Sequence, residues 1–515
     1  MKTGSILLAL FVAAIAWPTA AAPKPKPGPR HLTRAVLQDK IKGGWAGQMI
    51  GVSYGAPTEF RAQGKILEGE LKWSPDRVEN SIHQDDLYVE MTMAAVMDRL
   101  GLAATCEQFG EAFKDSKYGL WHANAAARRA LNQGIKAPMS GHPRYNVHAN
   151  DIDFQIEADF IGLMTPGLPR ESDRFCDRVG RVMNYGDGLY GGMFVCGMYS
   201  AAFFENDPRK VVEAGLACIP ARSTYAQLVR DLLAWSAQYP GDWRKVWQMV
   251  EDKWDKDDPC PDGALQPFNI DAKLNGAYIA LGLVFGNGDF LKTMEIATRC
   301  GQDSDCNPSS AAGVLGVMLG YSRIPEEFKA GIGAIADTKF EFTDYSFNTI
   351  CRFSLKSALD LIDKNGGQVT GDEITIPYQA PKPPKLEQWD PGIPDRKIGA
   401  KDSAWTWTGN WTEDKGAMLC RGAGGESTLK FNGVAVVLMG RLSQEGGRAD
   451  VYLDGKKAGV ADAYIVPNTH DDALWHTYGL KPGAHTVKIV TTGAADSRSK
   501  GQTVAIERAV VYRAR

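Results

Sequence analysis

The segment that decides the fold is Gly301–Gly320, GQDSDCNPSSAAGVLGVMLG, in which two carboxylates precede a small, apolar helix. Asn307-Pro308 predicts the start of that helix, because proline is favoured at the first helical position. The glycines that follow allow close packing against neighbours, so we expect Asp303 and Asp305 to lie at an enclosed helix end. Enclosed carboxylates repel one another and lose hydration. A divalent cation with oxygen ligands resolves both problems.

A second acidic cluster, His83-Gln84-Asp85-Asp86, precedes the amphipathic stretch Asp86–Leu100, which predicts another helix. Either cluster alone is consistent with helix capping and solvated surface charge, because the helix macrodipole favours carboxylates at an N-terminus. If the fold brings the clusters together, four aspartates form a binuclear metal site. Both interpretations stay open at the level of sequence.

Three segments carry a resemblance to a known family. The pattern G-x-D-S-D-x-N-P at Gly301–Pro308, followed by A-A-G-x-x-G, resembles the second metal motif of the ADP-ribosylglycohydrolase family. Gln84-Asp85-Asp86 with Met91 resembles the first motif, and Gly43–Phe60 resembles the family's first glycine-rich helix. The resemblance covers roughly residues 35–365. It implies an all-α catalytic domain that hydrolyses a glycosidic bond with one or two divalent cations, Mg²⁺ first and Ca²⁺ or Mn²⁺ as alternatives.

Carried over by position, the resemblance implies a set of cation ligands, in which Asp303 also takes part in catalysis: Gln84, Asp85, Asp86, Asp303 and Asp305. Two positions depart from the family pattern, since Gln84 and Cys306 stand where the family usually has Thr or Ser. Gln84 can offer a carbonyl oxygen, whereas a thiol is a poor ligand for Mg²⁺. The family's central adenine- and phosphate-contacting stretch has no clear match here, which favours a carbohydrate substrate.

The sequence predicts a multidomain fold, with an all-α ADP-ribosylglycohydrolase-like domain and a C-terminal all-β, jelly-roll-like sandwich. Four short segments with alternating polarity predict strands of the sandwich: Val434–Leu438, Ala449–Leu453, His485–Val490 and Val504–Tyr512. The expected boundaries are 1–22 for a signal peptide, 23–34 for a flexible Pro/Lys-rich leader, 35–368 for the helical domain, 369–399 for a proline-rich linker and 400–515 for the sandwich.

Composition and the N-terminus limit the function classes. The 515 residues carry a net charge of -3, so no basic field attracts nucleic acid. Lys2, the apolar run Ile6–Trp17 and small residues after it predict a signal peptide, hence a periplasmic or extracellular protein without a transmembrane segment. The nine cysteines are odd in number and contain no CxxC pair, which predicts neither a disulfide scaffold nor a zinc site. Disulfide pairing and oligomeric state stay open.

Further candidates for catalysis and sugar binding come from other segments. Asp159 precedes a strongly apolar run, so it is either a general acid with a raised pKa or a buried, hydrogen-bonded carboxyl. The glycine-rich loop Asn184–Gly192 either lines a sugar site or is a structural turn. The resulting predictions are Asp159 and Asp187 for catalysis, and Gln155, Asn184, Tyr185, Tyr190 and Trp475 for substrate binding. Trp475 is alternatively part of the sandwich core.

Three functions follow from these patterns. The first is a secreted, metal-dependent glycoside hydrolase that acts on a carbohydrate or glycoside. The second is an exported hydrolase that removes ADP-ribose from protein or small molecules. The third is a non-catalytic carbohydrate-binding protein whose metal site has decayed through Gln84 and Cys306.

Overall fold

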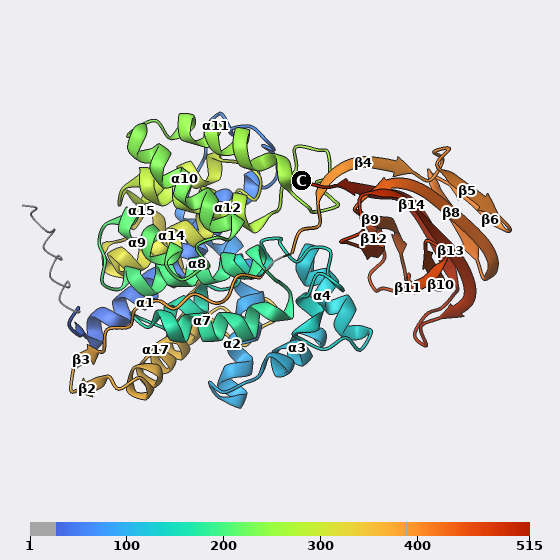
Figure 1. The fold of residues 1–515 in the computed structure, drawn as a ribbon. Helices are drawn as coiled ribbons and strands as arrows, with labels where there is room; N and C mark the ends of the chain where they lie inside the picture. The colour runs from blue at the N-terminus through green and yellow to red at the C-terminus, as the bar shows by residue number, and fades with distance from the viewer. Residues whose placement is uncertain (1–26, 388) are drawn as a thin grey trace, which may run out of the picture.

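A helical domain lies beside a β-sandwich in the computed structural model, which describes residues 27–387 and 389–515 (Figure 1). The fold class expected from the sequence is therefore confirmed. The predicted signal peptide lies outside the described residues. Among the described helices, none is both long enough and apolar enough to cross a membrane.

The helices of the first domain pack around one large apolar core. Their bounds are α1 (Arg34–Gly55), α2 (Asp85–Leu100), α3 (Cys106–Lys114), α4 (His122–Asn132), α5 (Asp153–Ile156), α6 (Asp159–Leu163), α7 (Pro169–Val179), α8 (Asp187–Ala202), α9 (Pro208–Leu216), α10 (Thr224–Gln238), α11 (Trp243–Trp254), α12 (Ala272–Gly286), α13 (Phe290–Arg299), α14 (Cys306–Leu319), α15 (Glu326–Lys329), α16 (Ile332–Ile335) and α17 (Phe347–Lys364).

Helices α1 and α14 form the closest contact in this domain, and glycine makes it possible. A Cβ atom added at Gly47 would lie 2.1 Å from the carbonyl oxygen of Ala312, and one at Gly316 would lie 2.1 Å from that of Gly43. Real side chains do not tolerate such distances, so the two backbones touch where no side chain separates them. This contact fixes the start of α14, and with it the second acidic cluster, against the end of α1.

The C-terminal domain consists of two antiparallel sheets around a second apolar core. One sheet has the order β11-β10-β13-β8-β5 and the other β12-β9-β14-β7-β6, with β4 paired to β14. The strands are β4 (Ile393–Gly399), β5 (Trp405–Thr408), β6 (Trp411–Asp414), β7 (Ala417–Arg421), β8 (Ala423–Gly433), β9 (Ala435–Leu442), β10 (Gly447–Leu453), β11 (Lys456–Asp462), β12 (Thr469–Thr477), β13 (Gly483–Ala495) and β14 (Thr503–Arg513). In β8, buried Leu429 and Phe431 alternate with exposed Lys430 and Asn432. This is the period-two pattern of a strand with one solvent-exposed face.

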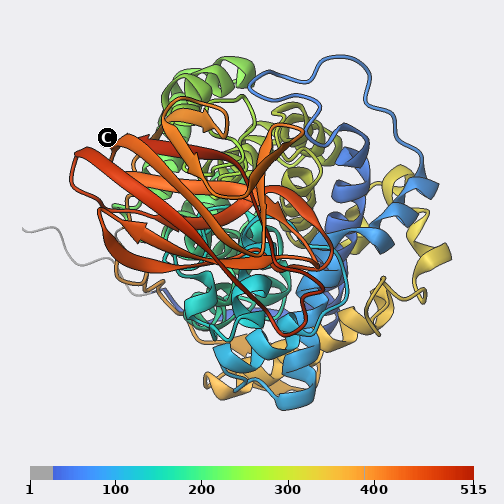
Figure 2. The same ribbon diagram turned by 90° about the vertical axis from the view of Figure 1, so that its right-hand side faces the viewer.

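The sandwich packs one face of its second sheet on the helical domain, as both views show (Figures 1 and 2). Strand β9 is buried on both faces, because Val436 and Leu438 enter the sandwich core while Val437 and Met439 face the other domain. The hydroxyl of Tyr512 also donates a hydrogen bond to the carbonyl of Pro259 at 2.8 Å. The domains therefore share a continuous apolar interface.

Two segments expected to be irregular contain strands. Within the predicted flexible leader, β1 (Arg30–Thr33) pairs with β3 (Glu373–Ile376), which in turn pairs with β2 (Gln368–Thr370). The backbone is ordered there because Leu32 is buried and its strand has a partner that is remote in sequence. The predicted linker likewise contributes β3 at its start and β4 at its end. The last residues of the predicted leader therefore belong to a sheet of the helical domain.

Candidate active site

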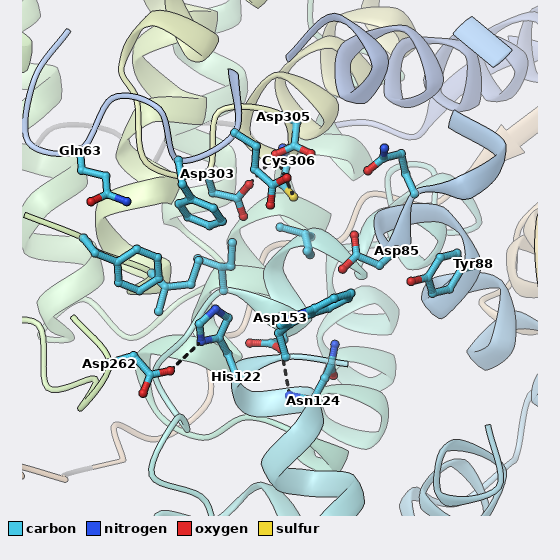
Figure 3. Close-up of a pocket in the computed structure, with 18 of the residues that line it drawn as sticks. Gln63, Asp85, Tyr88, His122, Asn124, Asp153, Asp262, Asp303, Asp305 and Cys306 are labelled. Carbon is cyan, nitrogen blue, oxygen red and sulfur yellow. Dashed lines mark hydrogen bonds and ion pairs between the residues drawn. The ribbon is translucent and has the colours of Figure 1, made fainter. Parts of the chain in front are cut away.

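A cavity of about 680 Å³ opens in the helical domain where the two acidic clusters meet (Figure 3). Asp303, Asp305 and Cys306 lie along one side, beside Asp85 at the start of α2. Across the cavity lie residues from the start of α4 and from α5. The aspartate pairs, which are more than 200 positions apart in the chain, thus converge on one space.

Contacts between the acidic clusters are direct. The Cys306 thiol donates a hydrogen bond to Oδ2 of Asp86 at 3.1 Å, and the backbone N–H of Cys306 donates to Oδ1 of Asp303 at 3.4 Å. Burial and the charges of Asp85 and Asp305 raise the pKa of Asp86 well above its usual range. Burial and the charge of Asp305 do the same for the pKa of Asp303.

The donor set fits hard divalent cations. Oδ1 of Asp86 is buried without a hydrogen-bond partner. Within the described chain, no lysine or arginine forms an ion pair with Asp85, Asp86, Asp303 or Asp305. Four clustered carboxylates without a positive partner are stable only if protons or cations neutralise them, and carboxylate oxygens are the preferred ligands of Mg²⁺, Ca²⁺ and Mn²⁺.

Backbone contacts hold the second acidic loop in place. Gln302 adopts a left-handed conformation, with φ of 55°, and its side-chain amide donates to the carbonyl of Pro267 while accepting from the N–H of Asn269. Its backbone also pairs with Phe60 and Ala62. One buried glutamine therefore ties the loop before α14 to two other walls of the cavity.

Asp159 and Asp187, predicted for catalysis, do not line this cavity. Oδ2 of Asp159 accepts a hydrogen bond from Ser310 at 3.3 Å, deep in the core, where burial raises its pKa to about 7. Oδ2 of Asp187 accepts from the backbone N–H of Tyr225 at 3.2 Å. Asp159 is a buried carboxyl with a protein partner, the second interpretation that the sequence left open for it, and half-buried Asp187 likewise has a protein partner.

The predicted sugar-binding residues also lie elsewhere. The Gln155 side chain contacts the Tyr225 hydroxyl at 2.7 Å in the core. Asn184 donates to the carbonyls of Ala149 and Asp151, and accepts from the N–H of Phe154, so it holds the turn before α5. These contacts satisfy buried backbone groups, which explains the two polar side chains without a ligand.

The aromatic candidates do not reach the cavity either. The Tyr190 hydroxyl accepts from the N–H of Glu387 at 2.7 Å, and the ring of Tyr185 packs against His142 with centroids 4.9 Å apart. Trp475 lines a separate groove of about 550 Å³ between the two domains, together with Trp389. The structure therefore separates these side chains from the carboxylates.

Several cavity residues carry no sequence motif that singles them out. Trp121 is 59% exposed at the cavity, and Glu59 follows the end of α1. Asp153 accepts hydrogen bonds from the backbone N–H groups of Ala123 and Asn124, which positions the start of α4. Of these residues, only Glu59 could have been found from the sequence, because it lies in the stretch that resembles the family's first helix.

His122 also faces the cavity and pairs with Asp262 at 3.6 Å (Figure 3). Burial lowers the pKa of His122, but the carboxylates of Asp262 and Asp151 outweigh that effect and raise it above its usual value. Its backbone has a φ of 43°, a conformation that a residue with a side chain rarely adopts without tertiary support.

The sequence model of the ADP-ribosylglycohydrolase family matches residues 33–349, well over half of the chain. The chain belongs to the ADP-ribosylglycohydrolase family. This is a family of hydrolases, and its members generally bind divalent metals, which agrees with the donor set described above.

Other comparisons are more distant. An A type blood α-D-galactosamine galactosaminidase of Flavonifractor plautii is 33% identical over 101 residues, which is 18% of this chain and 9% of that relative. Among solved structures, an ADP-ribosylglycohydrolase-related protein complex covers 63% of this chain and 99% of its own, at 15% identity and a TM-score of 0.42. The CBM36-1 domain of a multidomain xylanase from the hindgut metagenome of Trinervitermes trinervoides covers 22% of this chain and 94% of its own, at 16% identity and a TM-score of 0.17.

Proposed function

We propose that this protein is an exported, divalent-cation-dependent glycoside hydrolase whose substrate is an uncharged carbohydrate. The observation that carries the proposal is the convergence of Asp85, Asp303 and Asp305 on one cavity, with Asp86 buried directly behind its wall and bonded to Cys306. A curated relative named as a galactosaminidase supports a sugar substrate.

In this proposal, the four aspartates hold one or two cations, and Gln84 borders the same space. A bound cation would supply a Lewis acid that orients sugar hydroxyls and polarises a water molecule. The carboxylates contribute fixed negative charge close to the anomeric centre, where positive charge develops during glycoside cleavage.

Glu59 is the group best suited to hold and donate a proton. Although part of its side chain remains open to solvent, enclosure by the cavity walls and the charges of Asp305 and Asp85 raise the pKa of Glu59 to about 7. That value belongs to the metal-free chain, and a bound cation would offset the charges of Asp305 and Asp85. The position of Glu59 at the cavity beside these ligands therefore supports the role, rather than the pKa value. Glu59 lines the cavity, which Asp159 and Asp187 do not.

The charge of the cavity favours a neutral sugar over ADP-ribose. Among the described residues that line it, none is lysine or arginine, whereas six are Asp or Glu: Glu59, Asp85, Asp153, Asp262, Asp303 and Asp305. A pyrophosphate brings negative charge into this cavity and finds no lysine or arginine to bind it. The exposed ring of Trp121 offers instead an apolar face on which a sugar ring can stack.

The test is hydrolysis of a panel of glycosides and oligosaccharides, alongside an ADP-ribosylated peptide, by the purified mature chain. We expect release of a sugar from at least one carbohydrate, loss of activity with chelator and recovery with Mg²⁺, Ca²⁺ or Mn²⁺. Asp303→Asn should abolish activity, whereas the exposed control Asp252→Asn should retain it. Wild-type rates in Asp303→Asn would contradict the proposal.

An exported ADP-ribosyl hydrolase is the second candidate, because the family match by itself favours that chemistry. Turnover of the ADP-ribosylated peptide without turnover of any carbohydrate would select it. If the protein binds a sugar but neither hydrolyses it nor binds a cation, the non-catalytic carbohydrate-binding function is selected.

A further inference from the structure

Four potential metal ligands from separate segments meet behind the cavity wall, away from the aspartate cluster. His122 begins α4, His148 and Asp151 lie in the turn before α5, and Cys260 lies in the loop before α12. One ligand atom from each lies within 4.8 Å of the other three. Neither histidine was assigned a metal role from sequence, because the four positions form no local motif.

Two of the distances between these atoms are close to the edges of a tetrahedral site. With metal–nitrogen bonds of about 2.0–2.1 Å and metal–sulfur bonds of about 2.3 Å, ligand atoms around zinc are separated by about 3.3–3.6 Å. Here Sγ of Cys260 lies 3.5 Å from Nδ1 of His148, and Nδ1 of His122 lies 3.8 Å from Oδ2 of Asp151. The Nδ1 of His148 and Oδ2 of Asp151 are closer, at 2.8 Å, as in a hydrogen bond.

Unpartnered polar atoms point to a missing ligand. Asp151 is 1% exposed and Cys260 is fully buried. Oδ1 of Asp151 is buried without a hydrogen-bond partner, and Nδ1 of His122 has none at hydrogen-bond distance, since its contact with Asp262 is 3.6 Å long. Since unpaired buried polar groups are rare and costly, a group that binds both atoms would remove the penalty.

The local carboxylates also suit a bound cation. Within the described chain, the ion pairs of Asp151 are with His122 and His148 alone. Asp262 lies 3.6 Å from His122, and Asp258 is buried nearby with one unpartnered oxygen. A hydrogen-bonded His–Asp pair accounts for His148 and Oδ2 of Asp151, and an ion pair with Asp262 accounts for His122. Neither pair accounts for the approach of the Cys260 thiol or for Oδ1 of Asp151.

We propose that His122, His148, Asp151 and Cys260 bind a zinc ion in a closed, four-ligand structural site. Imidazole and thiolate ligands select zinc, whereas the carboxylates at the cavity select harder cations. The ion would join the start of α4 to the turn before α5 and to the loop whose Pro259 accepts the hydrogen bond from Tyr512. It would thereby hold His122 at the cavity wall beside the sandwich interface.

The test is metal analysis of the full mature chain, followed by Co²⁺ titration of the metal-stripped protein. We expect one zinc per chain and, with Co²⁺, a near-ultraviolet thiolate band together with visible tetrahedral bands. Cys260→Ser should lose the thiolate band and weaken zinc binding at least ~100-fold, more than the loss of an outer-shell partner costs.

Two controls separate this site from the rest of the molecule. Cys351→Ser replaces another buried cysteine, far from the cluster in α17, and should retain the band and the zinc. Asp303→Asn should also retain the band and the zinc. A failure of the proposed hydrolase function can therefore be distinguished from a failure of the proposed zinc site. The proposal would be overturned if the wild-type protein showed neither zinc nor the thiolate band. It would also be overturned if folded Cys260→Ser kept its zinc content. If Cys260→Ser does not fold, the Co²⁺ titration of the wild-type protein decides.

Discussion

Gly55→Ala should disable the proposed active site through packing alone. A Cβ atom at this position would lie 2.0 Å from the carbonyl oxygen of Ser304 and 2.5 Å from Cα of Asp305. An ordinary contact is at least 3.4 Å, so the loop that carries Asp305 must move by more than 1 Å. The structure gives it little freedom, because Gln302 ties the same loop to two other segments.

The expected effect is large on function and moderate on stability. Overpacking costs about 1–3 kcal/mol, and alanine in a helix returns up to about 1 kcal/mol relative to glycine. Displacement of a catalytic group by about 1 Å reduces turnover on the order of 100-fold. We therefore expect Gly55→Ala to fold, with a Tm lowered by a few degrees, but to lose most of its cation affinity and activity.

Calorimetric titration with Mg²⁺ or Ca²⁺, thermal unfolding and the glycosidase assay measure these quantities. Gly47→Ala is the matched control, because its Cβ would lie 2.1 Å from the carbonyl of Ala312 in the same helix contact, two turns from the carboxylates. It should lose similar stability and far less cation affinity. Wild-type affinity in Gly55→Ala, or equal losses of affinity in both variants, would refute the reasoning.

Three further changes test other parts of the structure. Asp303→Asn should lower cation affinity by at least ~100-fold while raising the Tm of the metal-free protein, because it relieves repulsion among buried carboxylates; a lower metal-free Tm would contradict this. Trp121→Ala should raise KM on the active glycoside with little change in kcat if the ring only binds sugar, and an unchanged KM would remove it from the substrate site. Asp173 is buried without a hydrogen-bond partner, and burial raises its pKa to about 8. Because that value lies above the pKa in the unfolded chain, the contribution of Asp173 to the free energy of unfolding should fall by about 1.4 kcal/mol per pH unit as pH rises from about 4 to 8, and Asp173→Asn should remove this component. Thermal unfolding of both proteins at pH 5 and pH 8 measures the difference in Tm between Asp173→Asn and the wild type. The same difference at both pH values would contradict this prediction.

The parts of the fold that the sequence predicted are those with a local signal. Asp86–Leu100 shows helical periodicity, and α2 begins one residue earlier. The segment Val434–Leu438 predicted a strand and lies almost entirely in β9. By contrast, Arg30–Thr33 has a strand conformation because of a partner more than 300 residues away, and no local pattern shows that partner.

The same distinction separates the residues of the candidate site. Asp303 and Asp305 lie in a contiguous motif with a close-packed helix behind it, so their enclosed position follows from the local sequence. Asp159 and Asp187 also lie at the starts of apolar helices, yet neither lines the cavity, because only the arrangement of the helices decides which N-termini open into it. Trp121 reaches the cavity through a loop whose position depends on tertiary contacts.

The two departures from the family pattern have unequal consequences. Gln84 still borders the cavity and retains an oxygen that can bind a cation. Cys306 donates its thiol hydrogen to Asp86 and leaves the other oxygen of that carboxylate without a partner. A thiol that donates to a ligand need not be a ligand itself, so all four carboxylates remain available for cations. Cys306, in place of the family's usual Thr or Ser, therefore changes one hydrogen bond to a ligand. It leaves the set of four carboxylates intact, which argues against decay of the metal site.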